Sequence, residues 1–162
     1  MAMDIFARIG TLAGESVDKV HAGKIDVLAW SWGLSNGGTT HSGGGGGAGK
    51  ANGQDLSFTK YVDKSSPTLI GASFSGKHFD DAEIIVRKAG GKGAPIEYIK
   101  ISMTEVLIAS VSTGGSGGED RLTENVVLNF AKVKFEYTEQ KPDGAKGATI
   151  PVTLNIAENN EE

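Results

Sequence analysis

The sequence has 162 residues, a length that suits one domain with a buried core. Glycine is abundant, with 24 residues, and proline is scarce, with 4; because 38% of the chain is apolar, this composition indicates strands joined by tight turns and not a disordered chain. The net charge is -4 and Lys and Arg form no run, so the chain lacks the basic stripe that binding to nucleic acid requires. The absence of Cys excludes disulfides and Cys-ligated metals.

The sequence also bears on where the protein resides. It contains no stretch of ~20 apolar residues that would cross a bilayer, so we expect no membrane insertion. Its first residues lack the basic and long apolar regions of a cleaved signal peptide. We therefore expect a single domain, residues 1–162, that resides in the cytoplasm or leaves it by a route that needs no signal peptide.

Nine short segments have the pattern of β-strands. After the first, Ile5–Ile9, comes Lys24–Leu34, which is apolar on both alternating faces: Ile25, Val27 and Ala29 on one, and Leu28, Trp30 and Trp32 on the other. Two apolar faces predict a core on one side and a neighbouring subunit on the other. The remaining candidates are Asp55–Val62, Ala82–Lys88, Ile96–Met103, Glu105–Val111 (again apolar on both faces), Glu124–Phe130, Ala131–Tyr137 (with Ala131, Val133, Phe135 and Tyr137 inward) and Ile150–Ile156. Such a series predicts an antiparallel β-barrel in which two sheets pack together.

One short helix is predicted between the third and fourth strands. Ser66 is placed to cap it, Pro67 suits its first position, and Gly76 suits its left-handed end. Its apolar stripe would be formed by Leu69, Ile70, Ala72 and Phe74. A helix of this length is marginal alone, so we expect it to cover one mouth of the barrel, with Asp63 serving the turn before it.

Two glycine-rich loops separate strands. Asn36–Gly53 is longer than the usual connection, and it is either a surface excursion or an arm that orders against another molecule. Within it, Gly44 to Lys50 has the spacing of a phosphate-binding loop, but Ala51 replaces the hydroxyl residue and no helix is predicted to follow. The second loop, Ser112–Glu119, contains a G-x-S-x-G match around Ser116 that is followed by another strand, not by the required helix.

Other residues that often carry chemistry have simpler interpretations. His21, His41 and His78 lack the spacing of metal ligands, so we expect no metal and no cofactor. Trp30 and Trp32 could stack on a sugar or a base, but an inward pair or an interface anchor fits their strand better. We find no assembled catalytic set and expect a protein that is not an enzyme.

In order and spacing, several segments resemble the Hcp (haemolysin-coregulated protein) family of the type VI secretion system. They are Gly14–Ser16 (GES), Ile25–Gly33 (IDVLAWSWG), Asp55–Pro67 (DLSFTKYVDKSSP), Gly76–Phe79 (GKHF) and Val106–Phe130 (VLIASVSTGGSGGEDRLTENVVLNF). The resemblance covers most of the chain up to about Tyr137 and is weaker in residues 138–162.

The resemblance implies a hexameric ring of barrels whose rings stack into a tube. Its partners would be further copies of itself, a trimeric spike, a contractile sheath and effector proteins carried in the channel, and the tube would be secreted from the cytoplasm. We expect ring contacts at Trp30, Trp32, Leu107 and Ala109, ring stacking by the Asn36–Gly53 loop with His41, Gly45 and Lys50, and channel contact at Ser31.

Two alternatives stay open at this point. A monomeric β-barrel that binds an apolar ligand would need a cavity lined by residues such as Trp30, Phe58 and Phe135. A hydrolase would need an activity that depends on Ser116.

Overall fold

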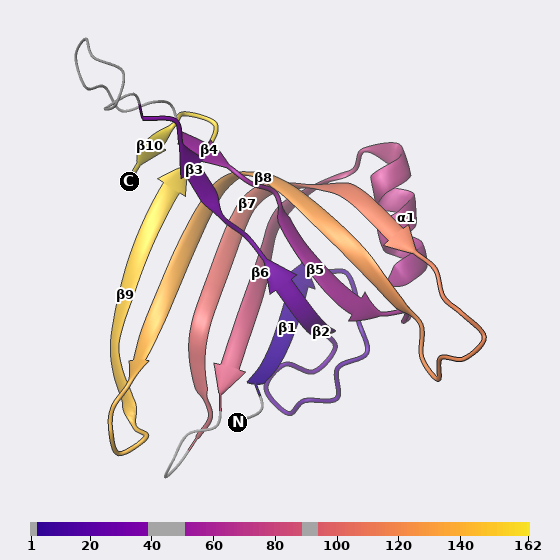
Figure 1. Ribbon diagram of the computed structural model, residues 1–162, viewed down its shortest axis with the longest axis horizontal. Helices are drawn as coiled ribbons and strands as arrows, with labels where there is room; N and C mark the ends of the chain where they lie inside the picture. Colours follow the sequence, from indigo (N-terminus) through magenta and orange to yellow (C-terminus); the bar gives the residue numbers. More distant parts are fainter. Residues whose placement is uncertain (1–2, 39–50, 89–93) are drawn as a thin grey trace.

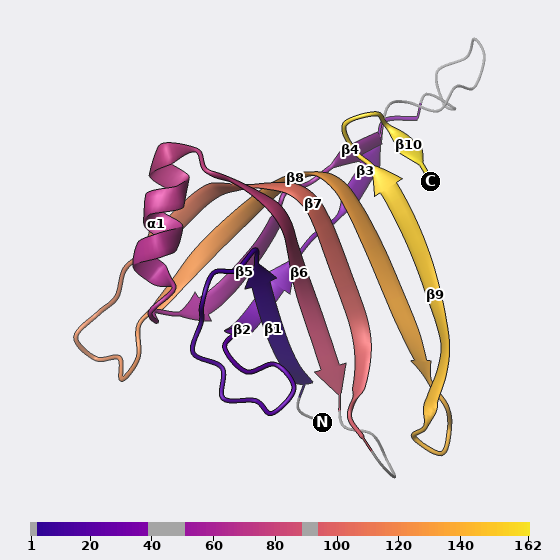
Figure 2. The ribbon, with the colours of Figure 1, turned by 180° about the vertical axis from the view of Figure 1, so that it is seen from behind.

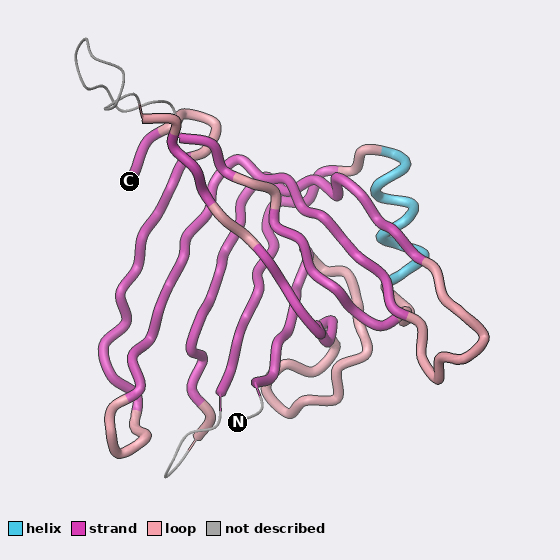
Figure 3. Tube along the Cα trace, viewed as in Figure 1, coloured by secondary structure: helices cyan, strands magenta, loops and turns pink. Residues whose placement is uncertain are grey.

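The computed structural model describes residues 3–38, 51–88 and 94–162. Strands dominate this part of the chain, with a single short helix, as predicted (Figure 3). In chain order the elements are β1 (Met3–Ile9), β2 (Ile25–Ser31), β3 (Leu34–Asn36), β4 (Ala51–Gly53), β5 (Leu56–Tyr61), α1 (Ser66–Ser75), β6 (His78–Lys88), β7 (Ile96–Thr113), β8 (Thr123–Gln140), β9 (Lys146–Asn155) and β10 (Asn160–Glu161).

The main sheet closes into a barrel. Its neighbours run β8-β5-β2-β1-β6-β7, and the pairing of β7 with β8 completes the circle. The first half of β8 lies between β5 and β7, whereas its second half pairs with β7 and β9, so β9 and β10 extend the sheet beyond the barrel (Figure 1). The predicted antiparallel barrel is confirmed.

The two longest strands each join segments that were predicted separately. β7 contains Ile96–Met103 and Glu105–Val111, and β8 contains Glu124–Phe130 and Ala131–Tyr137. The inward positions of β7 change phase at Glu105, which has a φ of 56°: Ile101 and Met103 are buried before it, and Val106 and Ile108 after it. A residue with positive φ bends the strand without ending it, which explains why the sequence pattern suggested two strands.

β2 contains a β-bulge that the sequence pattern does not reveal. Val27 pairs with Lys60 and Ala29 with Thr59, so Leu28 is the extra residue. The bulge exchanges the faces of all later residues: Trp30 and Trp32 pack against the barrel core, and Ala29 is exposed. The predicted face of Ile25, Val27 and Ala29 is therefore wrong at Ala29, and Leu28 does not share a face with the two tryptophans.

α1 covers one mouth of the barrel, as predicted (Figure 2). Leu69 and Ala72 point into the core, and Gly76 ends the helix with a φ of 68°. Two details were predicted wrongly: the N-cap is Ser65 and not Ser66, and the expected apolar stripe is incomplete because Phe74 is 95% exposed.

The barrel interior is packed with large side chains. Leu56, Phe58, Ile84, Ile101 and Leu128 are each no more than 1% exposed. Burial of such side chains supplies most of the stabilisation of a small barrel, at about 1.5–3 kcal/mol for each. The filled interior leaves the outer faces of the strands as the surfaces on which function depends.

Candidate functional site: an uncharged outer face of the barrel

Four adjacent strand segments present an outer face without charged side chains. They are β2 after its bulge, β5, the first half of β8 and the second half of β7. We call this surface the uncharged face; its members are Ala29, Ser31, Ser57, Thr59, Tyr61, Leu107, Ser110, Ser112, Thr123, Asn125, Val127 and Asn129. Cross-strand hydrogen bonds order it, including the bond from Thr59 Oγ1 to Asn125 Oδ1 at 2.6 Å. It is a wide, mildly polar surface whose edges carry charge: Asp55 accepts a hydrogen bond of 2.9 Å from Asn129, and the Arg121 guanidinium lies 3.7 Å from the centre of the Tyr61 ring.

The outer face on the other side of the barrel is charged. Arg8 on β1 bonds Asp81 and Glu83 on β6, at 3.0 and 3.1 Å, and Lys24 also contacts Glu83 at 3.2 Å. Burial alone would raise the pKa of Glu83, but the hydrogen bonds from Arg8 and Lys24 outweigh it and leave the pKa lowered. The hydrogen bond from Arg8 likewise lowers the pKa of Asp81. These carboxylates therefore remain charged at neutral pH, and the two outer faces differ sharply in polarity.

The loop between β1 and β2, residues 10–24 (Figure 1), is firmly attached to this charged outer face through side-chain contacts with β6. Arg87 on β6 bonds both carboxylate oxygens of Asp18, with Nη1 at 3.0 Å from Oδ1, and it also reaches Asp4. The Arg87 hydrogen bond holds the pKa of Asp18 well below its usual range. His21 of the loop packs its ring against Phe6 on β1, with the ring centres 4.7 Å apart. The loop is thus an ordered part of the surface.

The GES segment of this loop has a structural role. A Cβ on Gly14 would lie 2.4 Å from the carbonyl oxygen of Lys24, so only glycine allows this close approach. Ser16 is buried and bonds Gly23 and Lys24 through its backbone, and Glu15 Oε2 accepts a bond of 2.8 Å from the amide of Lys64. The segment therefore connects the loop to the chain that leads into α1.

A buried polar cluster holds α1 on the barrel mouth. Lys60 Nζ, which is fully buried, donates to Asp63 at 3.1 Å, to the hydroxyl of Ser66 at 3.1 Å and to Glu124. Ser66 Oγ in turn donates to Glu124 Oε1 at 2.5 Å. Asp63 also accepts bonds from the amide and hydroxyl of Ser65, so its predicted role in the turn is confirmed. A serine beside a lysine can act as a nucleophile, but this pair lies inside the barrel, where a substrate would have no access.

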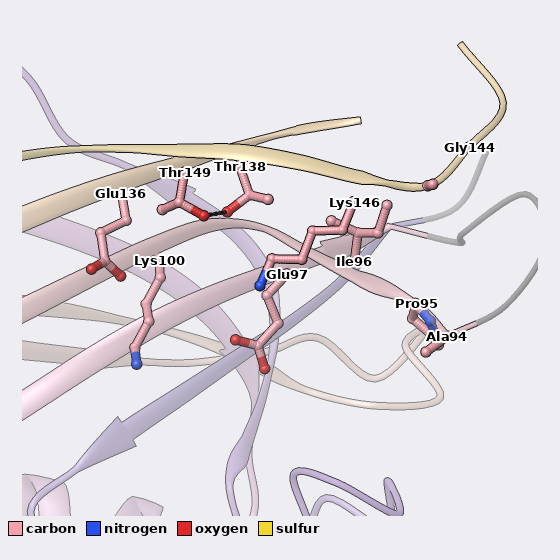
Figure 4. A pocket seen from close by; sticks show the side chains of 11 residues that line it. Ala94, Pro95, Ile96, Glu97, Lys100, Glu136, Thr138, Gly144, Lys146 and Thr149 are labelled. Atoms are coloured by element: carbon pink, nitrogen blue, oxygen red, sulfur yellow. Dashed lines mark hydrogen bonds between the residues drawn. The ribbon is translucent and has the colours of Figure 1, made fainter. Parts of the chain in front are cut away.

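A polar hollow of about 560 Å³ lies at the far end of β7, β8 and β9 (Figure 4). Lys100 and Lys146 line it together with Glu97 and Glu136, and Thr138 and Thr149 share a hydrogen bond of 3.0 Å at its edge. Two cations and two carboxylates balance, so the hollow has no net charge with which to select an ion.

The structure separates the predicted ring-contact residues. Trp30 and Trp32 lie on the inner side, where Trp32 Nε1 donates to the carbonyl of Gln54 at 2.9 Å. Leu107 lies on the uncharged face, and Ala109 is exposed at a bulge of the same strand. Ser31 is exposed on this face too, paired with Ser57. His41, Gly45 and Lys50 lie outside the described residues; the flanking β3 and β4 pair with each other. Sequence reasoning missed Thr59, Asn125 and Ser110, although the lack of charge at alternate positions of β5 was a usable signal.

Neither near-match motif has its required surroundings. Ala51, after the phosphate-loop-like segment, begins strand β4 and not a helix. Ser116 lies in the loop between β7 and β8, so a strand follows it as predicted. Among residues 3–38, 51–88 and 94–162, no group of three His, Asp or Glu side chains is placed to hold a metal ion, and no helix is long and apolar enough to span a membrane.

Comparisons with known proteins agree with this architecture. Residues 6–137 match the family model described as "Type VI secretion system effector, Hcp". The chain is 61% identical over 160 residues to protein hcp1 of Pseudomonas aeruginosa, with 98% of each chain covered. Hcp1 from Salmonella typhimurium has a similar structure, with a TM-score of 0.82, 38% identity and full coverage of both chains. A structure described as a type six secretion system protein gives a TM-score of 0.92 at 30% identity, covering 99% of this chain and 100% of its own. The chain therefore belongs to the Hcp family of type VI secretion proteins.

Proposed function

We propose that this protein is the tube subunit of a type VI secretion system: six copies form a ring, rings stack into a tube, and the uncharged face lines the channel and contacts effector proteins. The observation that carries the proposal is the contrast between the two outer faces. A surface that must let varied proteins pass gains from lacking fixed charges, because charge pairs would select or retain particular cargo. The charged face with its attached loop would then face away from the channel.

Exposed apolar side chains suggest how neighbouring copies meet. Ile70 and Phe74 on α1 are 46% and 95% exposed, and Tyr137 and Ile150 at the β8–β9 extension are 36% and 62% exposed. α1 and β9 lie at opposite ends of the longest axis (Figure 1). Two different patches at opposite ends suit head-to-tail contacts, which close into a ring when the rotation between copies permits.

Ser31 keeps its predicted role in channel contact, and Leu107 and Ala109 take the same role because they share its side of the barrel. Trp30 and Trp32 are better placed to stabilise the barrel wall than to meet a neighbour. Ring stacking through residues 36–53 remains part of the proposal, as do the trimeric spike, the contractile sheath and secretion without a cleaved signal peptide. We propose no enzymatic activity; the filled barrel interior also speaks against a ligand-binding monomer.

Native mass measurement of the purified protein tests the ring. We expect a hexamer for the wild type and smaller species for Phe74→Ser combined with Ile150→Ser, because both changes remove exposed apolar area without touching the core. Ile70→Ser alone is the milder companion variant. A wild-type protein that stays monomeric at micromolar concentration would contradict the proposal.

Cargo contact needs a separate test. Ser31→Arg places a long cation on the uncharged face. The change should not disturb the fold, because the hydroxyl that it removes is exposed. We expect the hexamer to persist and co-purification of effector proteins to fall. Ser102→Arg, which adds the same cation on the charged side of the barrel beside Glu83, is the matched control and should leave both readouts unchanged.

A further inference from the structure

The surroundings of His21 suggest a function for the β1–β2 loop beyond its place in the surface. The imidazole is 4% exposed and packs against Phe6 with the two rings tilted by 30°; Phe6 is equally buried although it lies on the outer side of β1. This contact makes His21 an apolar attachment of the loop, together with Leu12, which packs against the core, and next to the ionic attachment through Asp18 and Arg87.

The hydrogen bond at Nδ1 of His21 defines the protonation state of the ring. Lys24 Nζ lies 3.0 Å from Nδ1. An ammonium group can only donate, so Nδ1 must be the acceptor, and the ring is neutral with its proton on Nε2. Nε2 lies 3.2 Å from Glu97 Oε1 on β7, but this contact lacks hydrogen-bond geometry, so among the described residues the proton on Nε2 has no hydrogen-bond acceptor. The closed loop therefore requires one particular tautomer of a neutral histidine.

We propose that the β1–β2 loop is an acid-sensitive clasp, closed while His21 is neutral and released when His21 takes up a proton. A second proton would sit on Nδ1 and point at the ammonium of Lys24, which Glu83 also holds in place at 3.2 Å. The bond that orients the ring would be lost, and a cation would be buried against the Phe6 ring.

The charged groups around His21 do not compensate for placing a protonated imidazole next to the ammonium group of Lys24. Asp18 and Lys24 come from the loop, Arg87 and Glu83 from β6, and Glu97 from β7. Asp18 is already paired with Arg87, and the side chain of Glu97 is 43% exposed, which weakens its attraction through solvent screening. Burial, and after it the positive charge of Lys24, lowers the pKa of His21 below its ordinary value of 6.5.

Because the pKa of His21 is lowered in the closed loop, acid should destabilise loop closure. The released loop binds protons with an ordinary histidine pKa, whereas the closed loop binds them only at lower pH. Closure is therefore fully stable above about pH 6.5 and weakens below it, by at most about tenfold in its equilibrium constant per pH unit. Release would free Val17 and Val20, which are 96% and 72% exposed, from their ordered positions, and would break the contact of Glu15 with Lys64. This inference does not depend on the tube function.

Amide hydrogen exchange on the full-length protein tests the clasp. The amides of Gly14, Ser16 and Gly23, which bond within the loop, report its closure. After correction for intrinsic exchange rates, we expect their protection to fall as the pH drops below about 6.5, by at most about tenfold per unit, while barrel-core amides keep theirs. His21→Gln should abolish this dependence, because glutamine does not titrate.

Two results would overturn the proposal: loop protection that does not change with pH in the wild type, or an unchanged pH dependence in His21→Gln. Because that variant could fail to close its loop at all, an NMR titration of the wild type provides a second measurement. We expect the neutral ring to carry its proton on Nε2 and the His21 midpoint to lie below 6.5. A midpoint at or above 6.5 would also overturn the clasp.

Discussion

Replacing Lys60 by methionine should destabilise the barrel strongly. Lys60 is fully buried and gives hydrogen bonds to Asp63, Ser66 and Glu124, and to the carbonyl of Tyr61 at 2.9 Å. Methionine has similar volume, so packing is largely kept, but Glu124 would be left as a buried carboxylate without its cation. Breaking a buried ion pair in this way costs about 3–5 kcal/mol, a large part of the total stability of a domain.

The free energy of unfolding can be measured by urea denaturation at a fixed protein concentration, with tryptophan fluorescence as the probe because Trp30 and Trp32 pack against the barrel. Lys60→Met with Glu124→Met should be less destabilised than Lys60→Met alone, since no buried carboxylate then remains at position 124. Lys100→Met is the control: this side chain is 38% exposed and 3.8 Å from Glu83, so its loss should cost less than about 1 kcal/mol. A Lys60→Met protein within 1 kcal/mol of the wild type, or a double variant that loses as much as both single changes together, would refute the reasoning.

Gly14→Ala and Arg8→Met test the charged side of the barrel, and Gly71→Ala tests the helix α1. Gly14→Ala should loosen the β1–β2 loop and increase its proteolysis, because the new Cβ would meet the Lys24 carbonyl; Gly71→Ala, at a helical site with open space, should instead stabilise by about 0.5–1 kcal/mol. The lowered pKa values of Asp81 and Glu83 contribute stability that is present at neutral pH, above their unfolded pKa values, and is lost as the pH falls below about 4.5. Arg8→Met should flatten this acid dependence in urea titrations between about pH 6 and 3, and an unchanged slope would show that Arg8 does not hold the two carboxylates.

The sequence pattern predicted strand positions well and strand faces less well. Alternation is a local property, so it located β1, β5 and the helix, whose end at Gly76 follows from glycine chemistry. It could not reveal the bulge at Leu28, since a bulge exists only relative to the partner strand and moves Trp30 from one face to the other. The bend at Glu105 could not be predicted either, because its positive φ occurs at a residue that is not glycine.

The candidate site, too, could be predicted only where it depends on the local sequence pattern and not on which strands pair. Ser31 was assigned to an outer surface, but the extent of the uncharged face depends on which strands lie side by side. Thr59 and Asn125 are 66 positions apart in the sequence and are joined by the β5–β8 pairing. The buried partners of Lys60 were hidden for the same reason, because Glu124 comes from a distant strand.

The most direct test of the tube proposal is an electron-microscopic structure of the purified protein at a resolution that places side chains. The proposal predicts six-membered rings with Ser31, Thr59, Asn125 and Ser110 facing the central opening, and the β1–β2 loop on a surface away from it. Isolated barrels, or rings in which the charged side with Arg8 faces the opening, would contradict it.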